Sequence, residues 1–240
     1  MAVGVLALMI GSPGLDLRQF RRLALYGLIA ALHFQLYVAS LSYTTVAHSL
    51  TLVYTAPVFV ALFTWLILGE RVPAVKLLGL PLVVIGVGLI AGFETRLDPT
   101  MALGDLMAVG SAICFGLYSV AGRRERTEIP VATYAATVYG TAGLWLLPFA
   151  VLAPGEVANA GPNQWAAVFA LGIFPLAIGH TLYNTAVRLT NPTYVNLIAT
   201  QEVIGGIALS AIFLGEQITL PALAGAIMTL AGVTWVVAKR

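Results

Sequence analysis

Glu202 is the residue whose type and position point most directly to chemistry. It lies about ten residues inside a long apolar segment, 192–214, and no other acidic residue lies so deep in one. Apolar surroundings favour the neutral form of a carboxyl group, so this side chain could hold a proton. It could exchange that proton for a cationic or amine-bearing substrate. The alternative is a neutral glutamic acid that hydrogen-bonds an asparagine or a histidine and serves only packing.

Two histidines lie at similar places in other apolar segments. His33 lies in the middle of segment 23–42, with Tyr37 one helical turn further along the same face. His180 and Asn184 repeat that spacing later in the chain. Because histidine titrates near neutral pH, each could carry protons or contact a substrate. The alternative is an interior residue whose hydrogen bonds are all satisfied.

Tyr54, Asn196 and Pro57 complete the set of candidates. Tyr54 lies on the polar face of segment 44–68, and Asn196 lies in segment 192–214, one helical turn before Thr200. Both could line a substrate path, with packing as the alternative. Pro57 is expected to kink its helix because proline lacks an N–H and clashes with the preceding turn. The kink would free backbone carbonyls that could line a cavity.

The composition indicates a chain whose solvent is mostly lipid. Of its 240 residues, 60% are hydrophobic and 9% are charged, and the mean hydropathy is +0.94. Soluble domains have about 25% charged residues. The net charge of +2 is small and its basic residues fall in short connections, which argues against a nucleic-acid partner. The only cysteine, Cys114, excludes a disulfide within the chain.

Signals for an enzyme are missing from the sequence. It has no H-E-x-x-H motif, no glycine-rich phosphate loop and no Cys/His spacing typical of a metal site. We therefore predict no enzymatic activity, no cofactor and no bound metal.

Long apolar segments separated by charges, prolines and glycines predict the elements that carry these residues. Backbone polar groups must be paired within hydrocarbon, so the segments are helices or barrel strands, and their length favours helices. The sequence therefore predicts an all-α polytopic membrane protein. Eight full transmembrane helices are expected, at about 23–42, 44–68, 73–93, 103–122, 130–152, 165–187, 192–214 and 219–238.

The basic residues predict the orientation of these helices. The connections expected on one side hold eleven of them, and those on the other side hold Arg96 alone. This positive-inside pattern places the C-terminus in the cytoplasm. We also expect the membrane to be a bacterial inner membrane. The eleven are Arg18, Arg21, Arg22, Arg71, Lys76, Arg123, Arg124, Arg126, Arg188, Lys239 and Arg240.

One pattern occurs twice in the chain, at an offset of 146 residues. An L-G-E triplet at 68–70 and again at 214–216 is expected to end one helix and turn the chain. Two glycines follow each triplet and would let neighbouring helices pack closely, as would Gly205 and Gly206 one turn beyond Glu202. The period contains five spans, an odd number, so the two copies enter the membrane from opposite sides. The repeated glycines are Gly79, Gly86, Gly225 and Gly232.

The repeat divides the chain into an incomplete copy, 1–93, and a full copy, 103–238. The first two spans of the second copy have no full partners in the first, and residues 1–10 are too short to cross a bilayer. We therefore expect the end of helix 2 to helix 5 in the first copy and helices 6 to 10 in the second. A natural eight-helix protein with an apolar leader is the alternative.

These spaced residues resemble the drug/metabolite transporter superfamily, in its ten-helix, two-repeat EamA-type branch. The resemblance is carried by the stretch from Pro57 to Gly86 and by its counterpart from Glu202 to Gly232. It implies a secondary transporter that moves small organic metabolites, such as amino acids, by alternating access. It also implies export rather than uptake and coupling to protons or to exchange. A homodimer in the lipid bilayer is left open.

One residue departs from the family pattern, and two other functions remain open. Val203 follows Glu202 where family members often have proline, so we expect the kink to be missing from the second copy. An intramembrane enzyme would gather His33, His180 and Glu202 at an opening towards a lipid-linked substrate. A membrane sensor or assembly partner that transports nothing would have a centre filled by side chains.

Overall fold

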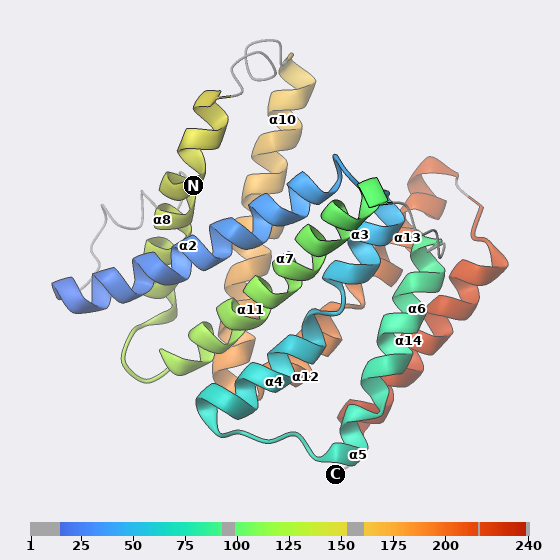
Figure 1. The fold of residues 1–240 in the computed structure, drawn as a ribbon, viewed down its shortest axis with the longest axis horizontal. Coiled ribbons are helices and arrows are strands. Elements are labelled where there is room, and N and C mark those ends of the chain that lie inside the picture. Colours follow the sequence, from blue (N-terminus) through green and yellow to red (C-terminus); the bar gives the residue numbers. More distant parts are fainter. Residues whose placement is uncertain (1–14, 93–98, 153–160, 216, 239–240) are drawn as a thin grey trace. The chain divides into compact units, whose positions relative to one another are not determined.

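The structure is a computed structural model that describes residues 15–92, 99–152, 161–215 and 217–238. Within these ranges the regular elements are helices, with no strand (Figure 1). The apolar leader 1–10, Arg96, Glu216 and the last two basic residues lie outside the described ranges. In chain order the helices are α2 (Leu17–Ser40), α3 (Val46–Val53), α4 (Ala56–Leu68), α5 (Ala74–Leu77), α6 (Gly79–Ala91), α7 (Pro99–Arg124), α8 (Val131–Leu152), α10 (Pro162–Leu171), η1 (Gly172–Gly179), α11 (His180–Leu189), α12 (Pro192–Ala199), α13 (Glu202–Leu214) and α14 (Leu220–Ala238).

Seven helical segments of the described ranges are long and apolar enough to cross a membrane. They correspond to seven of the eight predicted spans and confirm an all-α polytopic membrane protein. The remaining prediction, 130–152, coincides with the 22-residue helix α8, which is not among the seven. Its first half carries several polar side chains, Thr133, Thr137, Tyr139 and Thr141.

The chain forms two compact units. Unit 1 comprises the residues up to 32 together with 121–189, and unit 2 comprises 33–120 together with 190–240. Helices α2 and α7 contribute residues to both units. The units therefore do not coincide with the two sequence repeats, because each takes residues from both copies.

Helix α2 begins earlier than the sequence predicted. Asp16 Oδ1 accepts a hydrogen bond of 2.7 Å from the backbone N–H of Gln19, and Gln19 Oε1 accepts one of 3.1 Å from the N–H of Asp16. This reciprocal pair is a capping box, which satisfies N–H groups that a helix start leaves unpaired. The basic residues expected in a loop before the span, from Arg18 to Arg22, therefore lie in the first turns of the helix.

The L-G-E triplets end two equivalent helices. Helix α4 ends before Gly69 and α13 ends before Gly215, and both glycines have a φ of 69°. This left-handed conformation is costly for residues with a Cβ and commonly terminates helices. Within the described residues, the triplets therefore have the architectural role predicted for them.

The repeated glycines pair α6 with α14 in unit 2. An added Cβ at Gly79 would lie 2.5 Å from the carbonyl oxygen of Gly232, and one at Gly86 would lie 2.6 Å from that of Gly225. The order of these contacts makes the two helices antiparallel neighbours (Figure 1). In the repeat Gly79 corresponds to Gly225 and Gly86 corresponds to Gly232, so the two contacts are equivalent to each other. The interface between α6 and α14 is therefore self-complementary. Such an arrangement is what an inverted repeat requires.

Buried aliphatic side chains fill the space beside this glycine contact in unit 2. They are Leu80, Val83, Leu197, Val233 and Val236.

Gly205 and Gly206 do not take part in a comparable contact. An added Cβ at either position would meet no other described atom within 4 Å, and both residues are exposed. The close helix packing expected beside Glu202 is therefore not found among the described residues.

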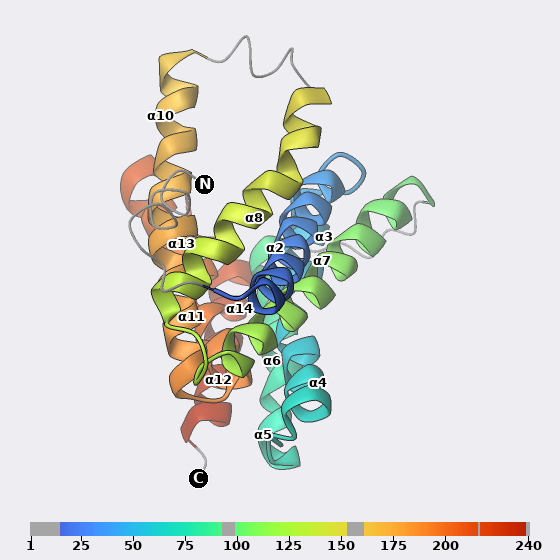
Figure 2. The same ribbon diagram turned by 90° about the vertical axis from the view of Figure 1, so that its left-hand side faces the viewer.

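The long helical segment of unit 1 contains a rare irregularity. Figure 2 shows α10, η1 and α11 following one another as one rod, and η1 is a π-helix of 8 residues. Pro175 lies inside η1 and cannot donate a backbone hydrogen bond. The wider turns of the π-helix end where His180 begins α11.

Candidate functional site

Two broken helices in unit 2 form the framework of the candidate site. The first break, at Tyr54 and Thr55, separates α3 from α4, and the second, at Thr200 and Gln201, separates α12 from α13. The two breaks lie at the same place in the repeat, since their residue numbers differ by 146. Such discontinuous helices commonly build the binding sites of secondary transporters.

The same backbone bonds form both breaks. Thr55 N–H donates to the carbonyl of Leu52 at 3.1 Å, and its counterpart Gln201 N–H donates to Ile198 at 3.0 Å. These bonds span three residues instead of four, so they tighten the helix end. Threonine hydroxyls support each end, because Thr55 Oγ1 and Thr200 Oγ1 each donate to the carbonyl three residues earlier at 2.6 Å.

The second copy therefore breaks without a proline. Pro57 lies at the start of α4, as the predicted kink requires, but Val203 occupies the same place in α13. The expectation that the second copy would lack the kink is wrong. The hydrogen bonds of the Thr200 hydroxyl and of the backbone at this break interrupt the helix, as the proline was expected to do.

We expect Pro57→Ala to preserve the break between α3 and α4, because the second copy keeps the same break with valine. Spin labels at the exposed positions 46 and 66, in a Cys114→Ser background, would measure the distance across the break. An unchanged distance is the expected result. Lengthening towards a straight helix, which rises about 1.5 Å per residue, would show that the proline alone bends it.

Tyr54 and Glu202 join the two breaks. Tyr54 Oη donates a hydrogen bond to Glu202 Oε1 across 148 residues of sequence. Tyr54 directly follows the first half-helix, α3, as its C-cap, and Glu202 is the first residue of α13. A negative charge in the first turn of a helix is favoured by the partial positive charge of the helix end. Glu202 is exposed, so a mobile ligand could reach its carboxylate within the described structure.

Tyr37 lies near this pair, and Asn196 lies behind it. Tyr37 is half-buried on α2 and lies within electrostatic range of Glu202. Asn196 is only 4% exposed, and its carbonyl accepts the backbone hydrogen bond of Thr200 at the end of α12. Unit 2 therefore brings Tyr37, Tyr54 and Glu202 together, while the burial of Asn196 fits the packing alternative.

His33 belongs to a separate polar contact in unit 2. Its Nδ1 lies 2.8 Å from Ser111 Oγ and 3.0 Å from the Ser111 carbonyl oxygen, and Ser111 Oγ donates to the His33 carbonyl at 2.8 Å. Both residues are buried. These bonds fit the alternative of a satisfied interior histidine. Ser111 had no signal in the sequence, because its partner lies 78 residues away.

Asp105 is a residue that the sequence reasoning did not select. It accepts a hydrogen bond of 2.7 Å from Thr44 Oγ1 and lies 3.3 Å from His48 Nδ1. The sequence signal that could have identified it is an acidic residue near the start of a predicted span. The contacts fix the connection before α3, where Thr45 caps the helix by accepting from the His48 N–H at 3.2 Å.

His180 and Asn184 lie in unit 1. Asn184 is fully buried, and its Nδ2 donates to Tyr139 Oη at 2.9 Å and to the His180 carbonyl at 2.8 Å. The rings of Tyr139 and His180 meet edge to face, with centroids 6.5 Å apart. These contacts connect α8 with α11. Their burial favours a packing role for Asn184.

A buried carboxylate in unit 1 is a second residue that the sequence did not indicate. Glu125 is 1% exposed and accepts hydrogen bonds from Arg22 at 2.7 Å and from Tyr26 at 3.0 Å. Arg22 also pairs with Glu128 at 2.8 Å. Removing one partner of a buried ion pair leaves an uncompensated charge, so this cluster holds α2 against the end of α7.

A metal site finds no support in the described ranges. Among those residues, no group of three or more His, Cys, Asp and Glu side chains could hold a metal ion.

Known proteins similar to this chain are membrane transporters. The EamA-like transporter family matches residues 1–92 and 102–238. An uncharacterized transporter of Archaeoglobus fulgidus is 29% identical over 82% of this chain and 69% of its own length. The uncharacterized transporter YyaM of Bacillus subtilis is 24% identical over 97% of this chain and 79% of its own. The aromatic amino acid exporter YddG of Ancylobacter novellus is 30% identical over 78% and 66%.

The fold also has a solved counterpart. A crystal structure matches with a TM-score of 0.83 at 22% identity and covers 99% of this chain and 83% of its own. The names of the relatives fit a protein that is not an enzyme. The helices, the family match and these relatives together establish an integral membrane protein that is a transporter, and the chain belongs to the EamA-like transporter family.

Proposed function

We propose that this transporter moves amino acids or related small metabolites, with export favoured, by alternating access. The observation that carries the proposal is the hydrogen bond between Tyr54 and Glu202 where two equivalent helices are broken. The exposed carboxylate would attract the ammonium group of an amino acid. The ends of the half-helices offer backbone groups to the other parts of the substrate.

The relatives support this choice of substrate. One of them is an aromatic amino acid exporter, and aromatic amino acids carry both an ammonium group and an apolar ring. Tyr37 and Tyr54 would offer aromatic surface beside Glu202 to such a ring. We therefore place phenylalanine and tyrosine first among the substrates to be tested.

Coupling would use Glu202 itself. The carboxyl group would bind either a proton or the substrate ammonium group, so that one displaces the other in each cycle. The two inverted repeats would then expose the site to either side of the membrane in turn. We further propose that the protein lies in a bacterial inner membrane with its C-terminus in the cytoplasm, as the basic residues predict.

Purified protein in proteoliposomes would test the proposal. Vesicles loaded with unlabelled phenylalanine should accumulate labelled phenylalanine by exchange, with saturation and competition by tyrosine. An inward proton gradient should drive efflux of the amino acid. No flux above that of protein-free vesicles for any amino acid would refute the proposed substrate class.

We expect Tyr54→Phe to reduce this flux by about fivefold, because the substitution removes one hydrogen bond to Glu202 while keeping the ring. Flux at saturating substrate measures the effect. Tyr43→Phe is the matched control, since Tyr43 is exposed and lies outside the pair. Equal flux in the two variants would remove the hydroxyl group of Tyr54 from the mechanism.

A further inference from the structure

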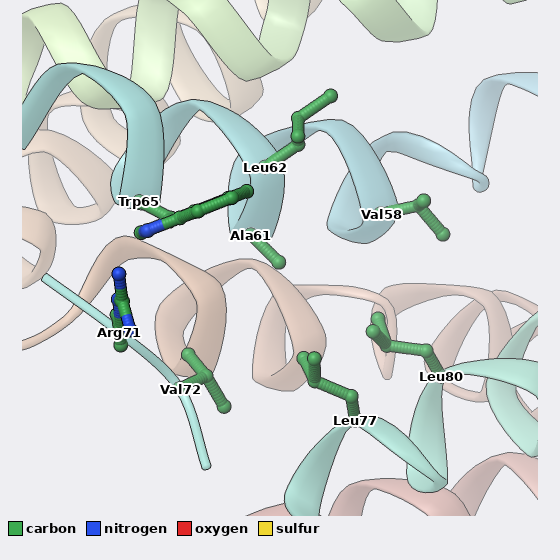
Figure 3. Close-up of a pocket in the computed structure, with 8 residues that line it drawn as sticks. All are labelled: Val58, Ala61, Leu62, Trp65, Arg71, Val72, Leu77 and Leu80. Carbon is green, nitrogen blue, oxygen red and sulfur yellow. The ribbon is translucent and has the colours of Figure 1, made fainter. Parts of the chain in front are cut away.

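A groove in unit 2 lies outside the pair formed by Tyr54 and Glu202. It has a volume of about 400 Å³ and runs between α4 and the segment that leads into α6. Figure 3 shows Val58, Ala61 and Leu62 on one wall and Leu77 and Leu80 on the other. The volume lies within the range of about 300–1,000 Å³ typical of ligand pockets.

One end of the groove differs from the rest. Trp65 and Arg71 lie there, and the Arg71 guanidinium carbon is 5.5 Å from the centre of the Trp65 ring system (Figure 3). Arg71 is exposed, and the ion pairs of the described residues do not include it. A second cation, Lys76, lies nearby in sequence with its Nζ 4.7 Å from the centre of the Tyr194 ring.

The long axis of the groove follows α4 into the membrane. Trp65 lies in the last turn of α4, and Val58 lies seven residues earlier, about 10 Å deeper along the helix. Aromatic and basic residues at the end of a span mark the level of the lipid headgroups. The charged end of the groove therefore lies at the membrane surface, and its apolar part lies beside the acyl chains.

The chemistry of the lining restricts the ligand. A polar metabolite needs several converging polar groups to orient it, and among the described residues that line the groove Arg71 alone is charged. An amphiphile with one anionic group and a long apolar part matches both ends. A guanidinium group binds phosphate oxygens through two parallel hydrogen bonds and can stack on an aromatic ring at the same time.

We propose that this groove binds one anionic phospholipid. Its phosphate contacts Arg71 beside Trp65, and one acyl chain lies between α4 and the residues Leu77 and Leu80. The positive charge of Lys76 adds to the preference for an anionic headgroup. The site is separate from the proposed transport site, so its test does not depend on flux.

Native mass spectrometry of the purified chain would count the bound lipids. Protein exchanged into equal amounts of phosphatidylglycerol and phosphatidylcholine should retain phosphatidylglycerol preferentially. Arg71→Gln should lower that preference by about fivefold, and Arg71→Lys should restore only part of it, because lysine keeps the charge but not the paired hydrogen bonds. Arg21→Gln, at an exposed position on α2, is the charge control and should leave the preference unchanged.

A second pair of variants tests the acyl chain. Ala61→Trp fills the groove and should lower the retention of both lipids, whereas Leu66→Trp places the same side chain on an exposed part of α4 and should not. Ala61→Leu serves the same purpose if Ala61→Trp does not fold as a monodisperse protein.

Three results would overturn the proposal. They are an unchanged preference in Arg71→Gln, equal lipid retention in the two tryptophan variants, and displacement of the lipid by glycerol phosphate alone. A dimer that is lost in Ala61→Trp would instead assign the groove to a second copy of the chain, and it would overturn the lipid proposal as well.

Discussion

Glu202→Gln is expected to reduce amino acid flux by roughly 10- to 100-fold, the range expected when the substrate ammonium group loses its hydrogen bond to a charged carboxylate. Glutamine has almost the same shape and can still accept the hydrogen bond from Tyr54. It carries no negative charge for a substrate ammonium group and cannot release a proton. Exchange and proton-driven efflux in proteoliposomes measure the two consequences separately.

The structure supplies a matched control for this variant. Glu70 follows the helix end at Gly69, outside the two broken helix regions, and Glu70→Gln should keep wild-type flux. Thermal unfolding of Glu202→Gln should match that of the wild type, because the hydrogen bond is kept. Undiminished flux with an unchanged response to the proton gradient would remove Glu202 from the mechanism.

Alanine at a glycine of the α6–α14 contact is expected to have the largest effect on stability. In Gly86→Ala the new Cβ would lie 2.3 Å from Thr229 Oγ1 and 2.6 Å from the Gly225 carbonyl oxygen. Backbone on the facing helix cannot move aside without separating the two helices. We expect the free energy of unfolding to fall by about 1–3 kcal/mol, as overpacking of a well-packed core does.

Symmetry makes this prediction more specific. The counterpart of Gly86 in the second copy is Gly232, whose Cβ would lie 2.7 Å from the Gly79 carbonyl oxygen. Alanine at 86 and at 232 should therefore destabilise the protein to a similar extent. Unfolding by heat or denaturant in the same detergent measures both variants.

Gly205→Ala and Gly206→Ala are the controls for this prediction. Both glycines lie in α13 with no other described atom within 4 Å of an added Cβ. Alanine favours a helix over glycine by up to about 1 kcal/mol, so these variants should be neutral or more stable. Equal destabilisation at positions 86 and 205 would contradict the assigned helix contact.

The alternative of an intramembrane enzyme finds no specific support in the contacts. It required His33, His180 and Glu202 to gather at one opening. In unit 2, His33 contacts Ser111, whereas Glu202 contacts Tyr54. His180 belongs to unit 1, where its carbonyl accepts from Asn184.

The sequence by itself determined the features that depend on local chemistry. Long apolar segments predicted the membrane helices, because an unpaired backbone in lipid is too costly. The L-G-E triplets predicted two helix ends, and the left-handed glycines at 69 and 215 form them. The spacing of the repeated glycines predicted close helix packing, which α6 and α14 show.

Only the tertiary structure decided which polar residues meet. Tyr54 and Glu202 are 148 residues apart, and no local pattern relates them. The break before Glu202 also escaped prediction, because threonine side chains and backbone bonds form it without a proline. Local propensity acts within a few residues along the chain, whereas a site depends on helices that packing brings together. The sequence therefore identified Glu202 as a candidate, because an acidic residue so deep in an apolar segment is rare. The tertiary structure then showed that its partner is Tyr54.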